Sequence, residues 1–197
     1  MTLSYLRDPE AIYRRSFALI RAEADLSRFP EELHPVALRL AHAAGDTAIL
    51  ADLAWSQGAV GAGKRALAGG APILADSEMV RAGIIAKDRA ICTLGDPETR
   101  TLAAELGTTR SAAAVELWRG HLADAVVAIG NAPTALFHLI EIVASGSPRP
   151  ALVLGFPVGF VGAAESKRAL AESGLPYIAL YGRRGGSALA AAAVNAL

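Results

Sequence analysis

A histidine at a predicted helix end is the first residue in this chain that could do chemistry. His42 falls in the last turn of a helix expected over residues 35–44, away from that helix's apolar face. The partial negative charge at a helix C-terminus favours a protonated imidazole, which can act as a general acid. Histidines at helix ends are also common on protein surfaces, so position alone leaves a catalytic and a structural interpretation open.

Arg110 stands at the opposite kind of helix end. It precedes a helix predicted over Ser111–His121. Thr108 or Thr109 is the expected N-cap of that helix. A cation in the first turn opposes the helix dipole, which costs roughly a few tenths of a kcal/mol. A nearby carboxylate, from the protein or from a ligand, would account for the arginine, and a solvated side chain is the alternative.

Other candidates for catalysis are few. Ser16 interrupts an apolar helical face, so its hydroxyl either bonds back to the helix or points into a site. The chain has no Gly-x-Ser-x-Gly motif, and its single cysteine, Cys92, lies in an apolar run and is predicted to be a core residue. One cysteine excludes an intrachain disulfide and a cysteine-based zinc site. The remaining histidines lack metal-ligand spacing and are interpreted as structural: His34, His121 and His138.

Two glycine-rich segments invite comparison with phosphate-binding loops. Gly58–Arg65 nearly matches a Walker A loop, but Arg65 replaces the required Ser/Thr, and the segment follows a predicted helix instead of a strand. We interpret it as a turn between helical segments. Gly155–Gly162 follows a predicted strand and leads into a predicted helix, so its N–H groups could hold an anion; an ordinary tight turn is the alternative.

Composition sets the class of protein. The chain has 197 residues, a length that predicts a single domain over residues 1–197. Its 19 Lys+Arg and 19 Asp+Glu give a formal net charge of zero. Zero charge without a basic run argues against general nucleic-acid binding. No apolar run reaches the roughly 20 residues that a membrane helix needs. Residues 1–8 contain no signal-peptide core, so we predict a cytoplasmic protein.

The N-terminal third of the chain, which carries Ser16 and His42, is predicted to be helical. A helix is expected whose apolar face includes Ile12, Ser16, Leu19 and Ile20. A second helix runs from about Pro35 to a stop at Gly45, and a third is predicted over about 47–67.

The remainder alternates between short apolar runs and Ala-rich helical stretches. Such alternation indicates βαβ units and a parallel sheet covered on both faces. In these sheets ligands bind at the carboxyl ends of the strands. The five predicted strands are Pro72–Ala75, Ala90–Leu94, Ala125–Ile129, Ala151–Leu154 and Tyr177–Tyr181.

Several longer blocks resemble a known family. The sequence contains Ile-Tyr-Arg-Arg-Ser-Phe at 12–17, Ala-His-Ala-Ala-Gly at 41–45 and Thr-Arg-Ser-Ala-Ala at 109–113. It also contains Ala-Ile-Gly-Asn-Ala-Pro-Thr-Ala-Leu at 128–136 and Pro-Val-Gly-Phe-Val-Gly-Ala at 157–163, then Gly-x-x-Gly-Gly-Ser at 182–187. In this order, from about Tyr5 to Asn195, these blocks resemble the precorrin-8X methylmutase family of cobalamin biosynthesis.

The resemblance implies a flavodoxin-like three-layer α/β fold, with a five-stranded parallel sheet and extra N-terminal helices. It implies an isomerase that moves a methyl group from C-11 to C-12 of precorrin-8X, giving hydrogenobyrinate, without cofactor or metal. It also implies a homodimer with active sites near the subunit interface. Hand-off of the product to the next enzyme of the pathway is a further possible interaction.

The resemblance also assigns roles to individual residues. His42 is the implied catalytic residue, which protonates or hydrogen-bonds ring C of the tetrapyrrole. Arg110 is the implied partner of a substrate carboxylate, and Ser16 places the substrate near His42. The other expected substrate contacts lie in matched blocks at strand ends: Asn131, Thr134, Gly159, Phe160 and Ser187.

Two other function classes remain to be distinguished. A non-catalytic carrier of hydrogenobyrinate would share the binding residues but would not need His42. A flavodoxin-like nucleotide-binding module would share the fold and the glycine loops, although the loops lack nucleotide-specific partners.

Overall fold

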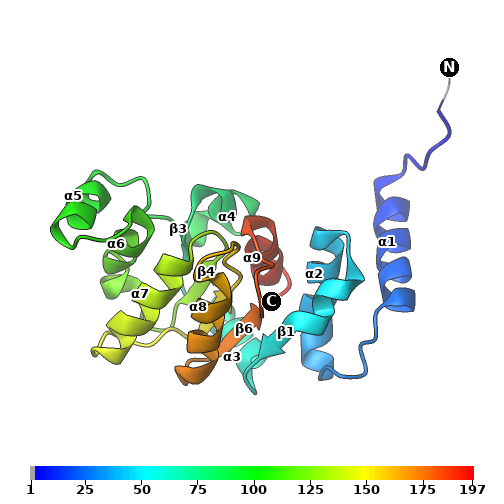
Figure 1. Cartoon of the computed structure of the whole chain (residues 1–197). Coiled ribbons are helices and arrows are strands. Elements are labelled where there is room, and N and C mark those ends of the chain that lie inside the picture. The colour runs from blue at the N-terminus through cyan, green and yellow to red at the C-terminus, as the bar shows by residue number, and fades with distance from the viewer. Residues whose placement is uncertain (1–2) are drawn as a thin grey trace.

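Six strands form one sheet in a computed structural model of the chain, which describes residues 3–197. The spatial order is β1-β6-β5-β4-β2-β3 (Figure 1). Strands β2 to β6 are parallel, which confirms the five predicted strands, and β1 pairs antiparallel with β6 at one edge. The strands are β1 (Leu53–Trp55), β2 (Ile73–Ala75), β3 (Ala90–Ile91), β4 (Val126–Ile129), β5 (Leu152–Gly155) and β6 (Tyr177–Leu180).

Helices cover both faces of the sheet, so successive strand residues are buried on alternate sides. Val126 and Ala128 pack in one core with α2, α3 and α9, whereas Val127 and Ile129 pack in a second core with α7 and α8. The nine α-helices of residues 3–197 are α1 (Pro9–Glu23), α2 (His34–Ala44), α3 (Ala59–Ala68), α4 (Glu78–Gly83), α5 (Pro97–Glu105), α6 (Arg110–Glu116), α7 (Pro133–Ala144), α8 (Ala163–Glu172) and α9 (Ser187–Val194).

Helix α2 has the predicted boundaries. Pro35 stands in its first turn, and Gly45 ends it with a left-handed φ of 64°, a conformation that glycine adopts without strain. Leu40 and Ala41 are buried against the core, and His42 points away from them. Helix α2 packs on α9, and α9 packs on strands β4 and β5, so these contacts attach the N-terminal helices to the sheet.

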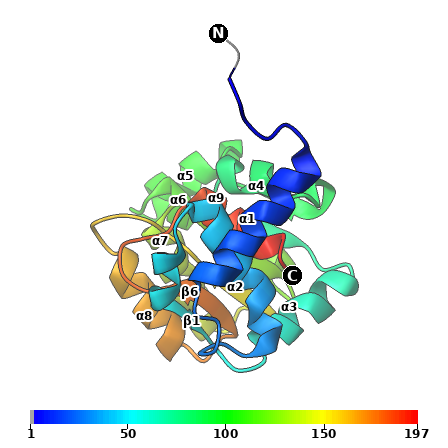
Figure 2. The same ribbon diagram turned by 90° about the vertical axis from the view of Figure 1, so that its right-hand side faces the viewer.

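Helix α1 packs chiefly on α2 and stands at the outside of the molecule (Figures 1 and 2). Its predicted apolar face is only partly correct. Phe17 and Ile20 are buried, but Ile12 and Leu19 are 47% and 53% exposed. The helix contacts the rest of the chain along one narrow stripe, so its other apolar side chains remain in solvent.

The third predicted helix, over residues 47–67, is wrong. A 3-10 segment, η2 (Thr47–Asp52), leads into strand β1, and α3 begins only at Ala59. Pairing of Leu53 with Leu180 in the neighbouring strand outweighs the helical preference of this Ala- and Leu-containing stretch.

The Walker-like segment therefore follows a strand, contrary to the prediction, and it is not a turn. Only Gly58 precedes the helix, with a φ of 75°, whereas Gly61 and Gly63 lie inside α3. A Cβ at Gly63 would come within 2.6 Å of Leu152 Cδ2, so this glycine allows α3 to pack closely on β5. Helical backbone leaves no loop here to surround a phosphate.

Candidate functional site

His42 and Ser16 are in direct contact, as two helices bring them together. Ser16 Oγ lies 2.9 Å from His42 Nδ1, so α1 and α2 each supply one partner of a hydrogen bond. The imidazole stacks on Phe17, with ring centroids 5.0 Å apart and an interplanar angle of 21°. Contact on one nitrogen and one ring face holds the imidazole in place, while the His42 side chain as a whole remains exposed.

The hollow beside this pair is small. Ser16 and His42 line a depression of about 210 Å³. Ligand sites for small molecules commonly measure about 300–1,000 Å³. A tetrapyrrole therefore could not be enclosed by this depression alone.

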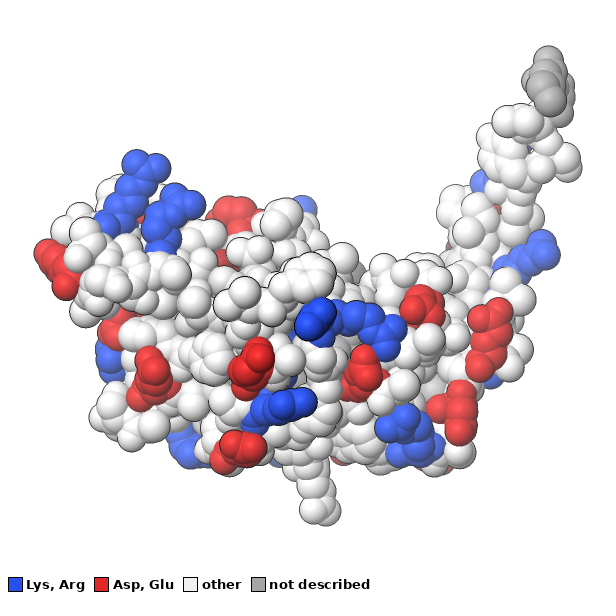
Figure 3. All heavy atoms as spheres, viewed as in Figure 1, with Lys and Arg blue, Asp and Glu red and all other residues white. Residues whose placement is uncertain are grey.

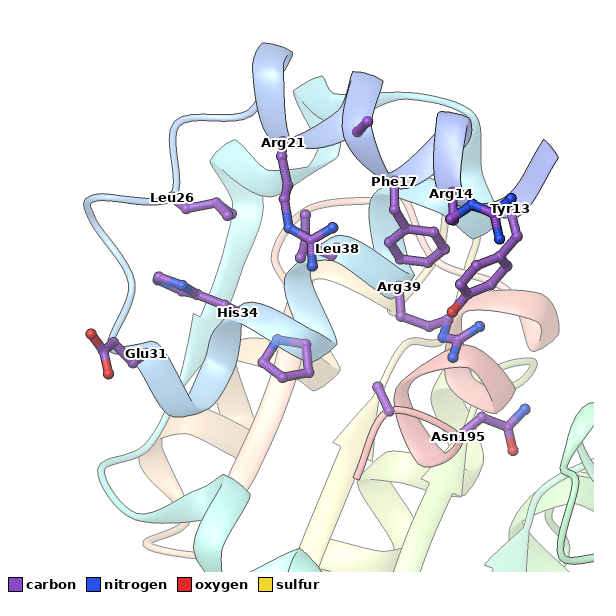
Figure 4. Close-up of a pocket in the computed structure, with 13 residues that line it drawn as sticks. Tyr13, Arg14, Phe17, Arg21, Leu26, Glu31, His34, Leu38, Arg39 and Asn195 are labelled. Atoms are coloured by element: carbon purple, nitrogen blue, oxygen red, sulfur yellow. The ribbon is translucent and has the colours of Figure 1, made fainter. Parts of the chain in front are cut away.

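A larger hollow of about 710 Å³ lies between α1 and α2 (Figure 4). Its lining includes Phe17, the residue that stacks on His42, and three arginines, Arg14, Arg21 and Arg39. The Arg39 guanidinium lies over the rings of Tyr13 and Phe17, at 5.8 and 5.6 Å from their centroids. Aromatic surface and positive charge therefore adjoin the His42 cluster.

Arg110 opens α6, as predicted, and Thr109 is the N-cap. Thr109 Oγ1 accepts a hydrogen bond from the backbone N–H of Ala112. The same hydroxyl donates to Thr134 Oγ1 at 2.8 Å, which joins the start of α6 to the start of α7. Arg110 is exposed, and within residues 3–197 it makes no ion pair with an acidic side chain. The anion that its position favours is thus not supplied by the described part of the chain.

Asn131 and Ser187 lie close to the carboxyl ends of β4 and β2. Ser187 Oγ is 3.4 Å from the Oγ of Ser77, the second residue after β2. The backbone N–H of Asn131 donates to the carboxylate of Asp76. Both residues are half-buried, so each presents part of its surface to solvent at this end of the sheet.

The loop after β5 has the predicted strand–loop–helix context. Gly162 caps α8 with a φ of 79°. Phe160 and Val161 are 85% and 89% exposed, so this loop presents a large apolar surface to solvent. Gly159 N–H donates to the carbonyl of Arg183, which links this loop to the loop after β6.

A buried lysine that was not among the predicted site residues holds the loop after β6. Lys167 is fully buried, and its ammonium donates to the carbonyls of Gly182 and Arg184. The Arg184 side chain bonds Asp52 at 2.7 Å and lies 3.6 Å from Asp46. This loop is therefore connected to the segment that follows His42.

Burial lowers the pKa of Lys167 to about 8, despite the nearby Asp52. The unfolded chain then binds more protons than the folded chain between about pH 8 and 10.5, so the free energy of unfolding rises with pH in that window. We expect wild-type protein to gain on the order of 1 kcal/mol over a Lys167→Met variant between pH 7 and pH 9. Denaturant unfolding at the two pH values measures this, and an unchanged difference between the proteins would contradict it.

Cys92 lies immediately after β3, not inside a strand, and it is half-buried. Burial, together with the nearby acidic groups of Glu78 and Asp76, raises the pKa of its thiol to about 11. A thiol in this state is a poor nucleophile at neutral pH. His34 and His138 bond protein groups, the carbonyl of Phe29 and the carboxylate of Glu116, which agrees with structural roles.

The predicted site residues form two groups that are far apart. Ser16 and His42 belong to α1 and α2, whereas Arg110 and Thr134 belong to α6 and α7 at the opposite end of the molecule (Figure 1). Figure 3 shows the same face with Lys/Arg and Asp/Glu side chains interspersed, and its upper outline is hollowed between these two ends. One chain does not bring His42 and Arg110 together.

Within residues 3–197 there is no group of three or more His, Cys, Asp or Glu side chains arranged to hold a metal ion. None of the helices in the same residues has the length and apolar character of a membrane span.

The strand order and the two helix layers define a flavodoxin-like α/β protein with an added antiparallel edge strand. The family model for precorrin-8X methylmutase, CbiC, matches residues 11–197. This chain belongs to the precorrin-8X methylmutase family, and it is an isomerase of cobalamin biosynthesis.

Individual relatives agree along nearly the whole chain. Precorrin-8X methylmutase from Pseudomonas aeruginosa is 56% identical, with 99% of this chain and 97% of the relative covered. Cobalt-precorrin-8 methylmutase from Methanothermobacter thermautotrophicus is 39% identical, over 94% and 90% of the two chains. The crystal structure of precorrin-8x methyl mutase from Thermus thermophilus superposes with a TM-score of 0.86 at 42% identity, covering 95% and 93%.

Proposed function

We propose that this protein moves the methyl group of precorrin-8X from C-11 to C-12 to give hydrogenobyrinate, and that His42 is its catalytic residue. The hydrogen bond between His42 Nδ1 and Ser16 Oγ carries the assignment. When the serine hydroxyl donates to Nδ1, the proton of the imidazole is on Nε2, the nitrogen that faces away from Ser16. In this neutral form Nε2–H can donate a hydrogen bond to ring C of the substrate. In the imidazolium form, Nδ1–H donates to Ser16 Oγ instead, and Nε2–H can transfer a proton to ring C.

A proton or hydrogen bond at ring C would draw electron density toward that side of the macrocycle. The migrating methyl then moves to the adjacent, more electron-poor carbon within the same molecule. Substrate and product contain the same atoms, so the step needs neither an oxidant nor a methyl donor. The work of the protein is to hold the macrocycle and to place one proton.

Ser16 orients the imidazole in this scheme. Replacing Ser16 by alanine removes one hydrogen bond and leaves the stacking on Phe17, so we expect the rate of conversion to fall about fivefold. Product affinity should change less than the rate. The comparison of kcat with the dissociation constant of hydrogenobyrinate measures this, and an unchanged kcat would exclude the orienting role.

We further propose that the site is completed by a second copy of the chain. His42 and Arg110 lie at opposite ends of one chain, and the depression beside His42 is too small for a macrocycle. In a two-fold dimer, the α1–α2 side of one subunit can face the strand-end loops of its partner. Arg110, Asn131 and Thr134 of one subunit would then bind substrate carboxylates opposite the His42 of the other, with Gly159, Phe160 and Ser187 beside them.

The metal-free tetrapyrrole is the proposed substrate. Relatives named precorrin-8X methylmutase are 56% identical to this chain, whereas those named cobalt-precorrin-8 methylmutase are 31–39% identical. We place the reaction in the cytoplasm, carried out by residues 1–197 as one domain. The product passes from there to the next enzyme of the pathway.

A single-turnover absorbance experiment tests the function. Enzyme in excess over precorrin-8X should convert the substrate spectrum into that of hydrogenobyrinate in one exponential phase. A carrier would bind the product, yet it would leave the substrate spectrum unchanged. Wild-type protein that binds hydrogenobyrinate but never converts precorrin-8X would therefore support the carrier and overturn the enzyme.

A further inference from the structure

A buried carboxylate lies at the centre of the strand-end face, outside the residues assigned above. Asp76 follows β2 directly and is only 2% exposed. Within residues 3–197 it makes no ion pair with a lysine or arginine. A buried charge without a cation needs other polar partners to be tolerated.

Those partners are three consecutive backbone N–H groups. Asp76 Oδ1 accepts from Gly130 at 2.9 Å, and Oδ2 accepts from Asn131 at 2.9 Å and from Ala132 at 2.8 Å. The three groups immediately precede α7, which begins at Pro133. Converging N–H groups and a helix N-terminus together form a strong anion site.

The position of this carboxylate in the fold is distinctive. From β2 the chain proceeds to β3 on one side, whereas β4, β5 and β6 follow on the other side. The crevice between β2 and β4 is therefore the point where the strand order reverses, and open α/β sheets usually bind their ligands there. In this protein, the carboxylate of Asp76 already occupies the anion position of that crevice.

Close packing leaves no space for an outside ligand at the same place. A Cβ added to Gly130 would lie 2.8 Å from Ala190 Cβ and from Ser187 Cα, and 2.9 Å from Val80 Cγ2. Helices α4 and α9 thus press on the segment that Asp76 binds. The N–H groups of Gly130–Ala132 are consequently committed to the protein, and only the Asn131 side chain remains to meet a substrate.

We propose that Asp76 is a positioning residue for the substrate site: it takes the place of a ligand anion at the start of α7, and thereby holds Asn131 and Thr134 in the geometry that binds the substrate. The proposal rests on the proposed function. Thr134 in turn bonds Thr109 beside Arg110, so the same fixed segment also supports the arginine.

The test uses two substitutions of Asp76 and one control. Asp76→Ala removes all three acceptors. Asp76→Asn keeps the shape of the side chain, but its amide group can no longer accept a hydrogen bond on both sides. Ile142→Ala, in the last turn of the same helix, destabilises α7 without touching Gly130–Ala132.

We expect both Asp76 variants to raise the KM for precorrin-8X and the dissociation constant of hydrogenobyrinate about tenfold, with a smaller change in kcat. Ile142→Ala should lower the melting temperature to a similar extent and leave KM within about twofold of wild type. Loss of binding that simply follows loss of stability across all three variants would overturn the proposal. So would a wild-type KM in either Asp76 variant.

Formate gives a second readout, which does not depend on catalysis. The cavity left by Asp76→Ala should accept formate on the three N–H groups, so formate should raise the melting temperature of this variant and lower its KM. Chloride at equal ionic strength should do neither, and wild-type protein should not respond to formate. A variant that formate does not stabilise contradicts the anion position even if the wild-type reaction proves to be different. Asp76→Asn supplies the KM test if Asp76→Ala does not fold.

Discussion

Chains carrying His42→Ala, which are slow in the chemical step, and chains carrying Arg110→Ala, which bind the substrate weakly, should regain activity when they form mixed dimers. In a site built from two subunits, one of the two sites of a mixed dimer combines intact His42 with intact Arg110. Purification through both tags isolates the mixed dimers, in each of which one of the two sites is intact, so about half of the wild-type activity per dimer is expected. Co-expression with two different affinity tags, tandem purification and a single-turnover assay measure the recovered fraction.

A matched control comes from the contact between Ser16 and His42. These two residues lie 2.9 Å apart in one chain, so mixing Ser16→Ala with His42→Ala chains leaves both sites of a mixed dimer defective. This pair should give no recovery beyond the residual activity of the Ser16→Ala site, which is about a tenth of wild type per mixed dimer (one site of two, slowed about fivefold). If the His42 and Arg110 variants also show no recovery, although mixed dimers have formed, the two residues do not serve one shared site.

His42→Ala alone should have the largest effect on the chemical step. Loss of a positioned general acid typically slows a reaction by about 10²–10⁴-fold, and we expect a fall in kcat within that range. The exposed imidazole contributes little to the core, so stability should change by less than about 1 kcal/mol. Hydrogenobyrinate should still bind. Rapid mixing with precorrin-8X, followed by absorbance, gives the rate.

His42→Gln is the corresponding control, because its amide can donate a hydrogen bond but cannot transfer a proton. If the imidazole only hydrogen-bonds ring C, His42→Gln should retain much more activity than His42→Ala. If it transfers a proton, the two variants should be similarly slow. Conversion at the wild-type rate by His42→Ala would remove the residue from the mechanism.

Much of the fold was predictable because it follows from regular patterns. The five parallel strands are short apolar runs separated by helical stretches. Parallel strands that are buried on both faces typically have nearly continuous apolar sequences of this kind. Gly45 marks a helix end through its left-handed backbone, and Thr109 marks a helix start through its capping hydroxyl. Strand β1 was missed because its three residues lie in an Ala- and Leu-containing stretch that favours a helix. Its pairing with β6 depends on residues more than a hundred positions away.

The site was predictable only in part, for a related reason. The positions of His42 and Arg110 at helix ends suggested chemistry, but their separation within one chain could not be read from the order of motifs. Asp76 and Lys167 bind backbone groups of distant loops. Because nearly every residue type has the same backbone groups, the sequence does not indicate which residues are their partners. Only the three-dimensional arrangement shows that these two charges hold the loops at the strand ends.

Strand β1 also determines how the N-terminal helices are mounted on the rest of the molecule. The chain passes from α2 through Gly45 and η2 into β1, which pairs with the edge of the sheet at Leu53–Leu180. This pairing covers the edge strand β6 and so withholds it from other chains. The same short ladder fixes the position of the element that carries His42 relative to the strands of its own chain, and so fixes the distance between the two surfaces that the proposed dimer would bring together. A one-residue change in the length of the connection would shift the histidine by a few ångströms (about 3.3 Å per extended residue), with every side chain of the site still present.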